Sequence, residues 1–324
     1  MERVSDYSAI IEGELRKLEL PTGKLSLLYE PISYALAAGG KRLRPVMVLM
    51  AAEAFGGPEA RERAMRPALG YEMFHNFTLL HDDVMDNSDT RRGRPSVHAK
   101  WDANTAILSG DTMLTLATQM VSEVEDSILR QVLDTFNSMA IEVYEGQRLD
   151  MDFEKLQEVT MPEYSEMIAK KTGALMGAAL KTGALIGGAS EKDAQALYDF
   201  GLTLGLAFQM EDDWLDTFGD QLTFGKPIGG DIRNNKKTFL MVKALERQDE
   251  DSKALRAALA LDSSDLKVKT VTRILQRMGI NDAVRKDISS TTSKALHSLK
   301  KTSMGEEGKE AFRKLVEKLA SRKS

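Results

Sequence analysis

Apolar residues recur three and four positions apart over most of this chain, which is the spacing of one face of an α-helix. Long helices are predicted at about 5–20, 24–38, 45–55, 60–85, 101–126 (with a notch at 109–111), 127–150, 162–190 and 191–218. Shorter helices are predicted at about 238–248, 252–261, 266–278, 281–299 and 305–321. No stretch of any length alternates between apolar and polar residues as a strand does. The pattern therefore predicts an all-α protein.

Composition adds mainly exclusions to this picture. A chain of 324 residues can bury a large core, and no linker divides it, so one domain over residues 1–324 is the simplest account. The net charge of −5, without a basic stripe, argues against nucleic acid as a partner. The lack of cysteine excludes disulfides and thiolate chemistry. No apolar run approaches the ~20 residues of a membrane span, and the N-terminal stretch is unlike a secretory signal. We expect a cytoplasmic protein without a membrane anchor.

A cluster of carboxylates ends the predicted helix 60–85. It consists of Asp82, Asp83 and Asp86, and Arg91 and Arg92 follow shortly after. Positions four apart differ by ~40° around a helix, so Asp82 and Asp86 share a face that Asp83 flanks. Acidic residues at a helix C-terminus oppose the helix dipole and cost stability unless a cation compensates them. A solvated helix end is the alternative interpretation of one such cluster.

A second cluster with the same spacing, Asp212, Asp213 and Asp216, makes the solvated interpretation much weaker. Two such clusters on apolar helices are typical of a site that binds one polyanion through bound cations. Aspartate oxygens suit Mg²⁺ or Mn²⁺, and Mg²⁺ commonly binds a few carboxylates together with phosphate oxygens. The four histidines show no zinc spacing, and neither nucleotide-binding glycine motif is present. The sequence therefore predicts a phosphate-rich ligand, most simply a diphosphate.

Basic and polar residues near these clusters supply further candidates. Lys41, Arg42 and Arg44 follow two glycines, where backbone and side chains can converge on an anion. A glycine-rich loop at 219–237 carries three lysines, and a loop of this length in a helical protein is usually functional. Polar residues at 145–152, within the predicted helix 127–150 and just beyond it, fit either a solvated face or a site.

Taken together, the motifs resemble those of the trans-isoprenyl diphosphate synthases, the polyprenyl synthetase family. They run from about residue 39 to 239 in the family's order: GGKRLRP, HDDVMDNSDTRRGRP, EGQ, KTGAL, FQMEDDWLD and FGKPIGGD. The resemblance implies an all-α isoprenoid synthase fold, a helical bundle around a central cavity. It also implies head-to-tail condensation of isopentenyl diphosphate with a dimethylallyl, geranyl or farnesyl diphosphate, and a homodimer.

The resemblance also assigns roles to residues of this chain. The metal ligands would be Asp82, Asp86 and Asp212, which would hold up to three Mg²⁺ ions with the allylic diphosphate. Support for these ligands would come from Asp83, Asp213 and Asp216. The same diphosphate, or the cation that it leaves, would face Arg91, Lys171, Thr172, Gln209, Lys226 and Lys237. The isopentenyl diphosphate would be bound by Lys41, Arg44, His75 and Arg92.

This inventory suits the chemistry of an allylic leaving group. Metal ions stabilise the departing diphosphate as Lewis acids, and cationic side chains add preorganised electrostatic stabilisation. The amide of Gln209 and the hydroxyl of Thr172 could face the allylic cation. No protein general base is obvious, so the released diphosphate is the expected proton acceptor.

Product length is expected to depend on the helix below the first acid cluster. In this family, bulky residues there form the floor of the cavity, and Phe77 occupies the position most associated with stopping growth. Phe74 and Met73 lie lower, and an ideal helical wheel puts Thr78 and Phe74 nearer the face of Asp82. Ordinary core packing of these residues is the alternative. We expect a short-chain product, C20 slightly ahead of C15.

Three other functions compete with this hypothesis. A terpene cyclase shares the first acid motif and the fold, but usually carries an Asn/Asp-Ser/Thr-Glu metal site in place of the second. A non-catalytic subunit of a heteromeric synthase would be signalled by loss of either aspartate cluster, and both are intact. A structural helical protein with solvated acid clusters would not need the basic motifs.

Overall fold

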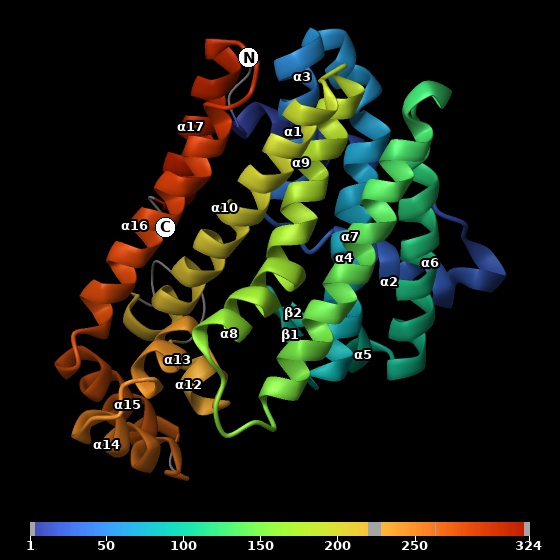
Figure 1. The fold of residues 1–324 in the computed structure, drawn as a ribbon. Coiled ribbons are helices and arrows are strands. Elements are labelled where there is room, and N and C mark those ends of the chain that lie inside the picture. The colour runs from blue at the N-terminus through green and yellow to red at the C-terminus, as the bar shows by residue number, and fades with distance from the viewer. Residues whose placement is uncertain (1–3, 220–227, 263, 321–324) are drawn as a thin grey trace. The chain divides into compact units, whose positions relative to one another are not determined.

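The protein is described by a computed structural model that covers residues 4–219, 228–262 and 264–320 (Figure 1). Nearly all regular structure in these residues is helical, which confirms the predicted all-α class. The chain divides into two compact units, each described by itself below. Unit 1 comprises Met1–Asn137, Ala178–Gln195 and Ser303–Ala311, and unit 2 comprises Ser138–Gly177, Ala196–Thr302 and Phe312–Ser324.

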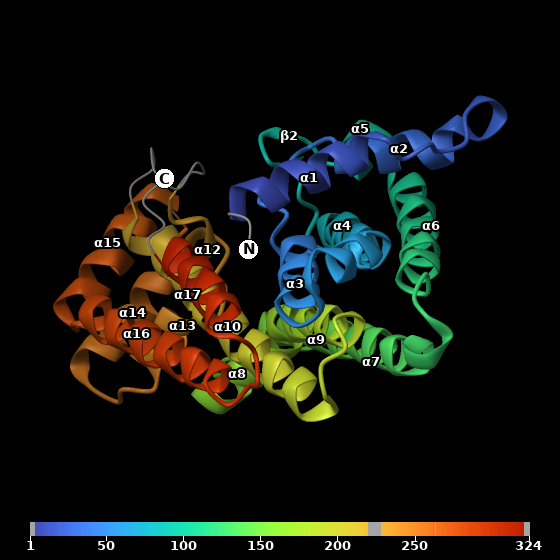
Figure 2. The same ribbon diagram turned by 90° about the horizontal axis from the view of Figure 1, so that it is seen from above.

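Unit 1 is built around one helix, α4. Its helices are α1 (Val4–Arg16), α2 (Ser26–Leu36), α3 (Leu43–Arg63), α4 (Met65–Met85), α5 (Val97–Lys100), α6 (Ala103–Val121) and the first part of α7 (Asp126–Phe153). Figure 2 shows α4 enclosed by α1, α2, α3 and α6, all of which it contacts. Because α4 is surrounded, most of its side chains are buried. The neighbouring helices therefore fix the position of α4, whose C-terminal end carries the first acid cluster.

Unit 2 carries the second acid cluster on α10 (Glu191–Phe218), a helix whose predicted limits are confirmed. A continuous helical segment consists of α8 (Met161–Ile168), the π-helix η2 (Ala169–Gly173) and α9 (Ala174–Ile186); it belongs to unit 2 as far as Gly177, and the rest of α9 belongs to unit 1. The remaining helices are α12 (Gly230–Arg233), α13 (Phe239–Leu245), α14 (Glu250–Leu259), α15 (Ser264–Arg277), α16 (Ile280–Leu299) and the part of α17 (Glu306–Ala320) that begins at Phe312. A shared apolar core joins α8, α10, α13, α14, α15 and α16.

Several boundaries differ from the predictions. The predicted helix 60–85 is two helices divided at Ala64, because Pro67 has no backbone N–H and is tolerated best within a first turn. The predicted notch at 109–111 is uninterrupted helix, and Gly110 there allows close packing: a Cβ on it would lie 2.6 Å from the Cδ2 of His81. Two short antiparallel strands, β1 (Thr90–Arg91) and β2 (Arg94–Pro95), were not predicted.

Candidate functional site

The first acid cluster lies on the last turn of α4, and its three aspartates have different surroundings. Asp83 is buried, whereas Asp82 is partly exposed and Asp86, the C-cap residue, is exposed. Arg91 donates two hydrogen bonds to Asp83 Oδ1, from Nε at 2.9 Å and from Nη2 at 2.5 Å. Its Nη2 also lies 3.4 Å from Asp82 Oδ2. Arg91 therefore balances part of the carboxylate charge directly.

For each residue of this pair, burial and the ion pair shift the pKa in opposite directions. Burial raises the pKa of Asp83 above its ordinary value, although the hydrogen bonds and charge of Arg91 oppose that shift. Burial alone would lower the pKa of Arg91, but the hydrogen bond and charge of Asp83 outweigh it and raise that pKa. Arg91 thus remains a permanent cation at the cluster.

The unpredicted hairpin positions the arginines. Arg92 and Gly93 have φ values of 53° and 73°, as the two central residues of a type I′ turn require. Tyr34 donates a hydrogen bond of 2.8 Å to the carbonyl of Pro95, and the Arg94 guanidinium lies 4.2 Å from the centre of the Tyr34 ring. The hairpin is thereby fixed to α2.

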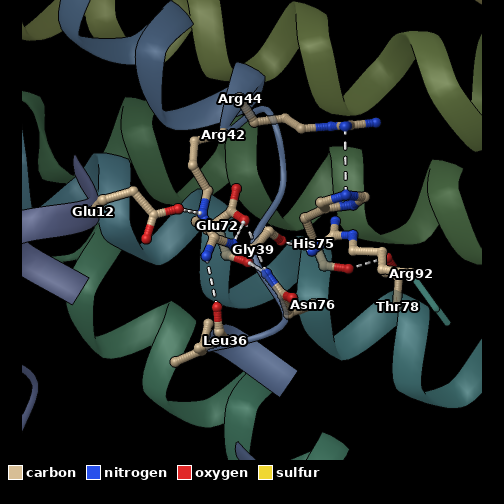
Figure 3. A network of polar contacts seen from close by, with 10 residues as sticks. All are labelled: Glu12, Leu36, Gly39, Arg42, Arg44, Glu72, His75, Asn76, Thr78 and Arg92. Carbon is tan, nitrogen blue, oxygen red and sulfur yellow. Dashed lines mark hydrogen bonds and ion pairs between the residues drawn. The ribbon is translucent and has the colours of Figure 1, made fainter. Parts of the chain in front are cut away.

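Arg44, His75 and Arg92 form a basic group beside α4 (Figure 3). Arg44 Nη1 lies 3.4 Å from His75 Nε2, and Arg92 donates to the carbonyl of Gly39. Because a guanidinium only donates, the contact between Arg44 and His75 requires an unprotonated Nε2 on His75. Burial, reinforced by Arg44 and Arg92, lowers the pKa of His75 well below 6.5. The group therefore presents two cations and a neutral imidazole, which suits an anion. Lys41 is exposed nearby in the sequence.

Arg42 differs from its two basic neighbours and corrects the expectation that all three converge on an anion. It is 3% exposed and donates to Glu72 Oε1 at 2.7 Å, to Glu12 Oε1 at 2.6 Å and to the carbonyl of Leu36 at 2.6 Å (Figure 3). Because Arg42 is buried and pairs with two carboxylates, its charge stabilises the fold and is not presented to an anion. The sequence analysis missed Glu72, whose only signal is a lone acidic residue within an apolar stretch of α4.

In the second cluster, Asp213 is almost completely buried and accepts three hydrogen bonds. The Tyr164 hydroxyl donates to Oδ2 at 2.7 Å, and the backbone N–H of Phe239 donates to the same oxygen at 2.8 Å. Gln209 Nε2 donates to Oδ1 at 3.0 Å. Burial raises the pKa of Asp213 to about 6, although these donors oppose the shift. Sequence reasoning did not identify Tyr164.

The other two aspartates of this cluster have separate surroundings. Asp216 accepts from the backbone N–H groups of Gly230 at 3.2 Å and Asp231 at 3.1 Å, so it holds the start of α12. Asp212 is only partly buried. Asp213 and Asp216 are therefore engaged with the protein itself, and Asp212 is the more accessible carboxylate.

The π-helix carries two predicted site residues. Lys171 Nζ lies 2.5 Å from Asp150 Oδ2, and Thr172 Oγ1 donates to Gln209 Oε1 at 3.4 Å. Gly146 allows α7 to approach this turn, since a Cβ on it would lie 2.7 Å from the Cα of Lys171. The sequence allowed two interpretations of Asp150, as part of a solvated face or of a site. In the structure it pairs with a predicted site residue.

The residues expected to set product length are packed within unit 1. Phe74 and Met73 are completely buried, Phe77 is 5% exposed, and Thr78 is partly buried. The Phe77 ring makes edge contacts with Phe74 and His81, at centroid distances of 5.4 and 4.8 Å. Phe77 is thus part of an aromatic cluster on α4.

The two lysines predicted from the glycine-rich loop, Lys226 and Lys237, have different outcomes. Lys226 is outside the described residues. Lys237 lines a cavity of about 210 Å³ with Arg256 of α14 and with residues of the connection 157–160, of α13 and of the segment that follows α13. Burial, with the nearby charge of Arg256, lowers the pKa of Lys237. None of the aspartates of either cluster lines this cavity.

The carboxylates have the chemistry of a hard-metal site without being assembled into one. In the part of the chain that the structure describes, no three histidine or acidic side chains are gathered closely enough to hold a metal. Asp82, Asp86 and Asp212 are the accessible members, and their oxygens are the ligands that Mg²⁺ prefers. The donor set therefore fits a divalent cation that arrives with phosphate oxygens. Across the described ranges, no helix is long and apolar enough to cross a membrane.

Comparisons with known proteins agree with these features. The family model described as polyprenyl synthetase matches residues 25–278. The geranylgeranyl diphosphate synthase of Methanosarcina mazei is 40% identical over 275 residues, 84% of each chain. A geranylfarnesyl diphosphate synthase of Natronomonas pharaonis is 36% identical over 291 residues, 85% of this chain and 84% of the relative. A crystal structure of a geranylgeranyl pyrophosphate synthase, 42% identical, superimposes with a TM-score of 0.94 over 100% of both chains.

Proposed function

Because the chain belongs to the polyprenyl synthetase family, whose members are prenyltransferases, we propose that it condenses isopentenyl diphosphate head-to-tail with an allylic diphosphate. Members of the family use a divalent metal to bind diphosphate. The proposed product is geranylgeranyl diphosphate, a C20 chain, in keeping with the names of the relatives.

One observation carries this proposal: α4 carries two chemically different groups of polar side chains. Its C-terminal end presents accessible carboxylates beside Arg91, which suits a diphosphate that binds with metal. Seven residues earlier, neutral His75 lies beside Arg44 and close to Arg92, and among the described residues no carboxylate is hydrogen-bonded to the imidazole. That group suits a diphosphate that binds through basic side chains. Two diphosphate substrates held by different chemistry are what a condensing prenyltransferase needs.

The allylic diphosphate is the substrate that ionises. Asp82, Asp86 and Asp212 would hold up to three Mg²⁺ or Mn²⁺ ions. Bound metal would act as a Lewis acid and neutralise the charge of the leaving diphosphate. Arg91 and Lys171 stabilise the departing charge, together with Lys226 and, in the assignment from the family, Lys237. Asp83, Asp213 and Asp216 support the clusters from within the protein.

The isopentenyl diphosphate is held by Lys41, Arg44, His75 and Arg92, so that its double bond reaches the allylic cation. The Gln209 carbonyl and the Thr172 hydroxyl provide dipoles for that cation without a strong nucleophile. The new carbon–carbon bond leaves a cation that loses a proton to the released diphosphate. This assignment requires no protein general base.

Phe77, backed by Phe74 and Met73, with Thr78 beside it, is proposed to stop elongation at C20. A C25 product has support from the geranylfarnesyl diphosphate synthases among the relatives, and C15 is the shorter alternative. We further propose one catalytic domain over residues 1–324 that acts in the cytoplasm as a homodimer.

The test incubates purified protein, Mg²⁺ and labelled isopentenyl diphosphate with each C5, C10 and C15 allylic primer, and then sizes the products. The expected result is a C20 product that disappears with EDTA and with Asp82→Ala. A C15 or C25 product would keep the reaction and overturn the assigned length. No condensation with any primer would overturn the proposed function.

A further inference from the structure

The bond between Tyr164 and Asp213 lies at the crossing of three helices of unit 2. Tyr164 is 1% exposed and belongs to α8, and Asp213 is 4% exposed and belongs to α10. Phe239, the first residue of α13, donates its backbone N–H to the same carboxylate oxygen. A single buried carboxylate therefore links α8, α10 and α13.

The carboxylate of Asp213 is nearly saturated by these contacts. A carboxylate offers about four lone-pair positions, and three are taken by the hydroxyl, the amide N–H and Gln209 Nε2. Burial leaves almost no surface through which the remaining position could reach a ligand. Asp213 is thus built as an anchor, whereas Asp212 beside it on α10 keeps an accessible carboxylate.

The anchor continues toward the π-helix. Gln209 donates to Asp213 with its Nε2 and accepts from Thr172 Oγ1 with its Oε1, so both ends of the amide are used. Tyr164 and Thr172 lie on one continuous helical segment, and both connect to α10, at Asp213 and Gln209. Two polar contacts eight residues apart therefore fix the segment that carries Lys171 against α10.

We propose that Tyr164 is a positioning residue: through Asp213 it holds Asp212, Gln209 and the Lys171–Thr172 turn in register for the allylic diphosphate. The proposal rests on the proposed function, since it concerns the same site. Partners behind the ligands of a metal site commonly change metal affinity or activity by 10–100-fold when they are replaced. Tyr164→Phe removes only the hydroxyl and keeps the buried ring.

The experiment compares Tyr164→Phe with the wild type and with Tyr198→Phe. Tyr198 is a matched control, because its hydroxyl donates to Glu142 Oε2 at 3.0 Å within the same unit, and among the described residues the carboxylates that act on it are Glu142 and Asp199, not those of either cluster. We expect Tyr164→Phe to raise the KM for the allylic primer and the Mg²⁺ concentration for half-maximal rate about tenfold. The KM for isopentenyl diphosphate should stay unchanged, because its proposed ligands lie in unit 1. Tyr198→Phe should change none of these values.

A second readout separates this proposal from the proposed function. Calorimetric binding of inorganic diphosphate with Mg²⁺ needs no turnover, and Tyr164→Phe should weaken it about tenfold relative to the wild type. Wild-type protein that forms no product would overturn the proposed function alone. Active wild type with unchanged Tyr164→Phe values would overturn the positioning role alone. A proportional rise of both substrate KM values would also overturn it, because that indicates general damage.

Asp213→Asn tests the anchor from its other end. If Tyr164 acts through Asp213, adding Asp213→Asn to Tyr164→Phe should cost less than Asp213→Asn costs in the wild type, because the bond between the two residues is already lost. Independent, multiplying losses would show that Tyr164 does not act through Asp213, and would overturn the positioning role.

Discussion

Arg42 and Glu72 form an ion pair of 2.7 Å in which the two side chains are only 1% and 2% exposed. Removing one member of such a pair leaves a buried charge without compensation, which typically costs 3–5 kcal/mol. We expect Arg42→Ala to lower the free energy of unfolding by about 3 kcal/mol or more. Urea unfolding, followed by circular dichroism, measures this loss.

The control for this prediction is an exposed ion pair in the same unit. Arg66 and Glu123 lie 2.9 Å apart with side chains 44% and 49% exposed. Water screens such a pair, so Arg66→Ala should cost no more than about 1 kcal/mol. Similar losses in the two variants would contradict the structural role assigned to Arg42.

Gly146 provides a prediction about backbone packing. A Cβ at this position would lie 2.7 Å from the Cα of Lys171 and 2.9 Å from the carbonyl carbon of Lys170, and backbone atoms cannot move aside as a flexible side chain can. We expect Gly146→Ala to destabilise the protein and to reduce activity, because the π-helix must shift. Thermal unfolding and product formation measure the two effects.

Gly13 is the matched glycine for this test. It also lies in a helix, α1, but a Cβ there would meet nothing within 4 Å. Alanine lowers the entropy of the unfolded chain and favours helix, so Gly13→Ala should be neutral or stabilise by up to about 1 kcal/mol. A loss of stability equal to that of Gly146→Ala would refute the steric account.

Phe77 yields a prediction about product length. Phe77→Ser removes an aromatic ring from the cluster on α4, and we expect products at least one isoprene unit longer than those of the wild type. Chromatographic sizing of labelled products gives the answer. Phe77→Met, which keeps most of the side-chain volume, should leave the length unchanged. Identical products from all three proteins would mean that Phe77 is an ordinary core residue.

His75 makes stability depend on pH. Its lowered pKa in the folded protein means that the unfolded chain takes up a proton near pH 6.5, whereas the folded protein resists protonation. Stability rises with pH wherever the unfolded state binds more protons, so the contribution of His75 is present above pH 6.5 and is lost as the pH falls below it. Urea unfolding at several pH values should show a smaller acid loss for His75→Gln than for the wild type. Parallel pH profiles would contradict the neutral imidazole.

The helices and the acid clusters were accessible from the sequence because their signals are local. Apolar periodicity located α10 to the residue, and the spacing of Asp82 and Asp86 indicated a shared face at a helix end. The predicted break between residues 55 and 60 is the kink at Gly57, where φ is 70°. The division at Ala64 was not predicted, because a short break scarcely disturbs the apolar periodicity. The β1–β2 hairpin is too short for any alternation to be seen.

The partners within the site could not be predicted, because they are distant in sequence. Arg42 and Glu72 are 30 residues apart, and Tyr164 and Asp213 are 49 apart. A sequence shows which residues can ionise, but the fold decides which of them are buried together. For this reason Arg42 looked like a ligand for an anion, and Tyr164 carried no signal at all.

The π-helix at Ala169–Gly173 has a consequence for helical phase. Eight residues separate Tyr164 from Thr172, and on an uninterrupted α-helix that step leaves them ~80° apart. A π-helical turn takes in one extra residue, so the effective step is seven, which returns the two side chains to within ~20° of one another. Both can then bond to Asp213 and Gln209, one turn apart on α10. The inserted residue is thus what lets one helix contact α10 twice, and deleting it would turn Lys171 and Thr172 to a different face while leaving the helix intact.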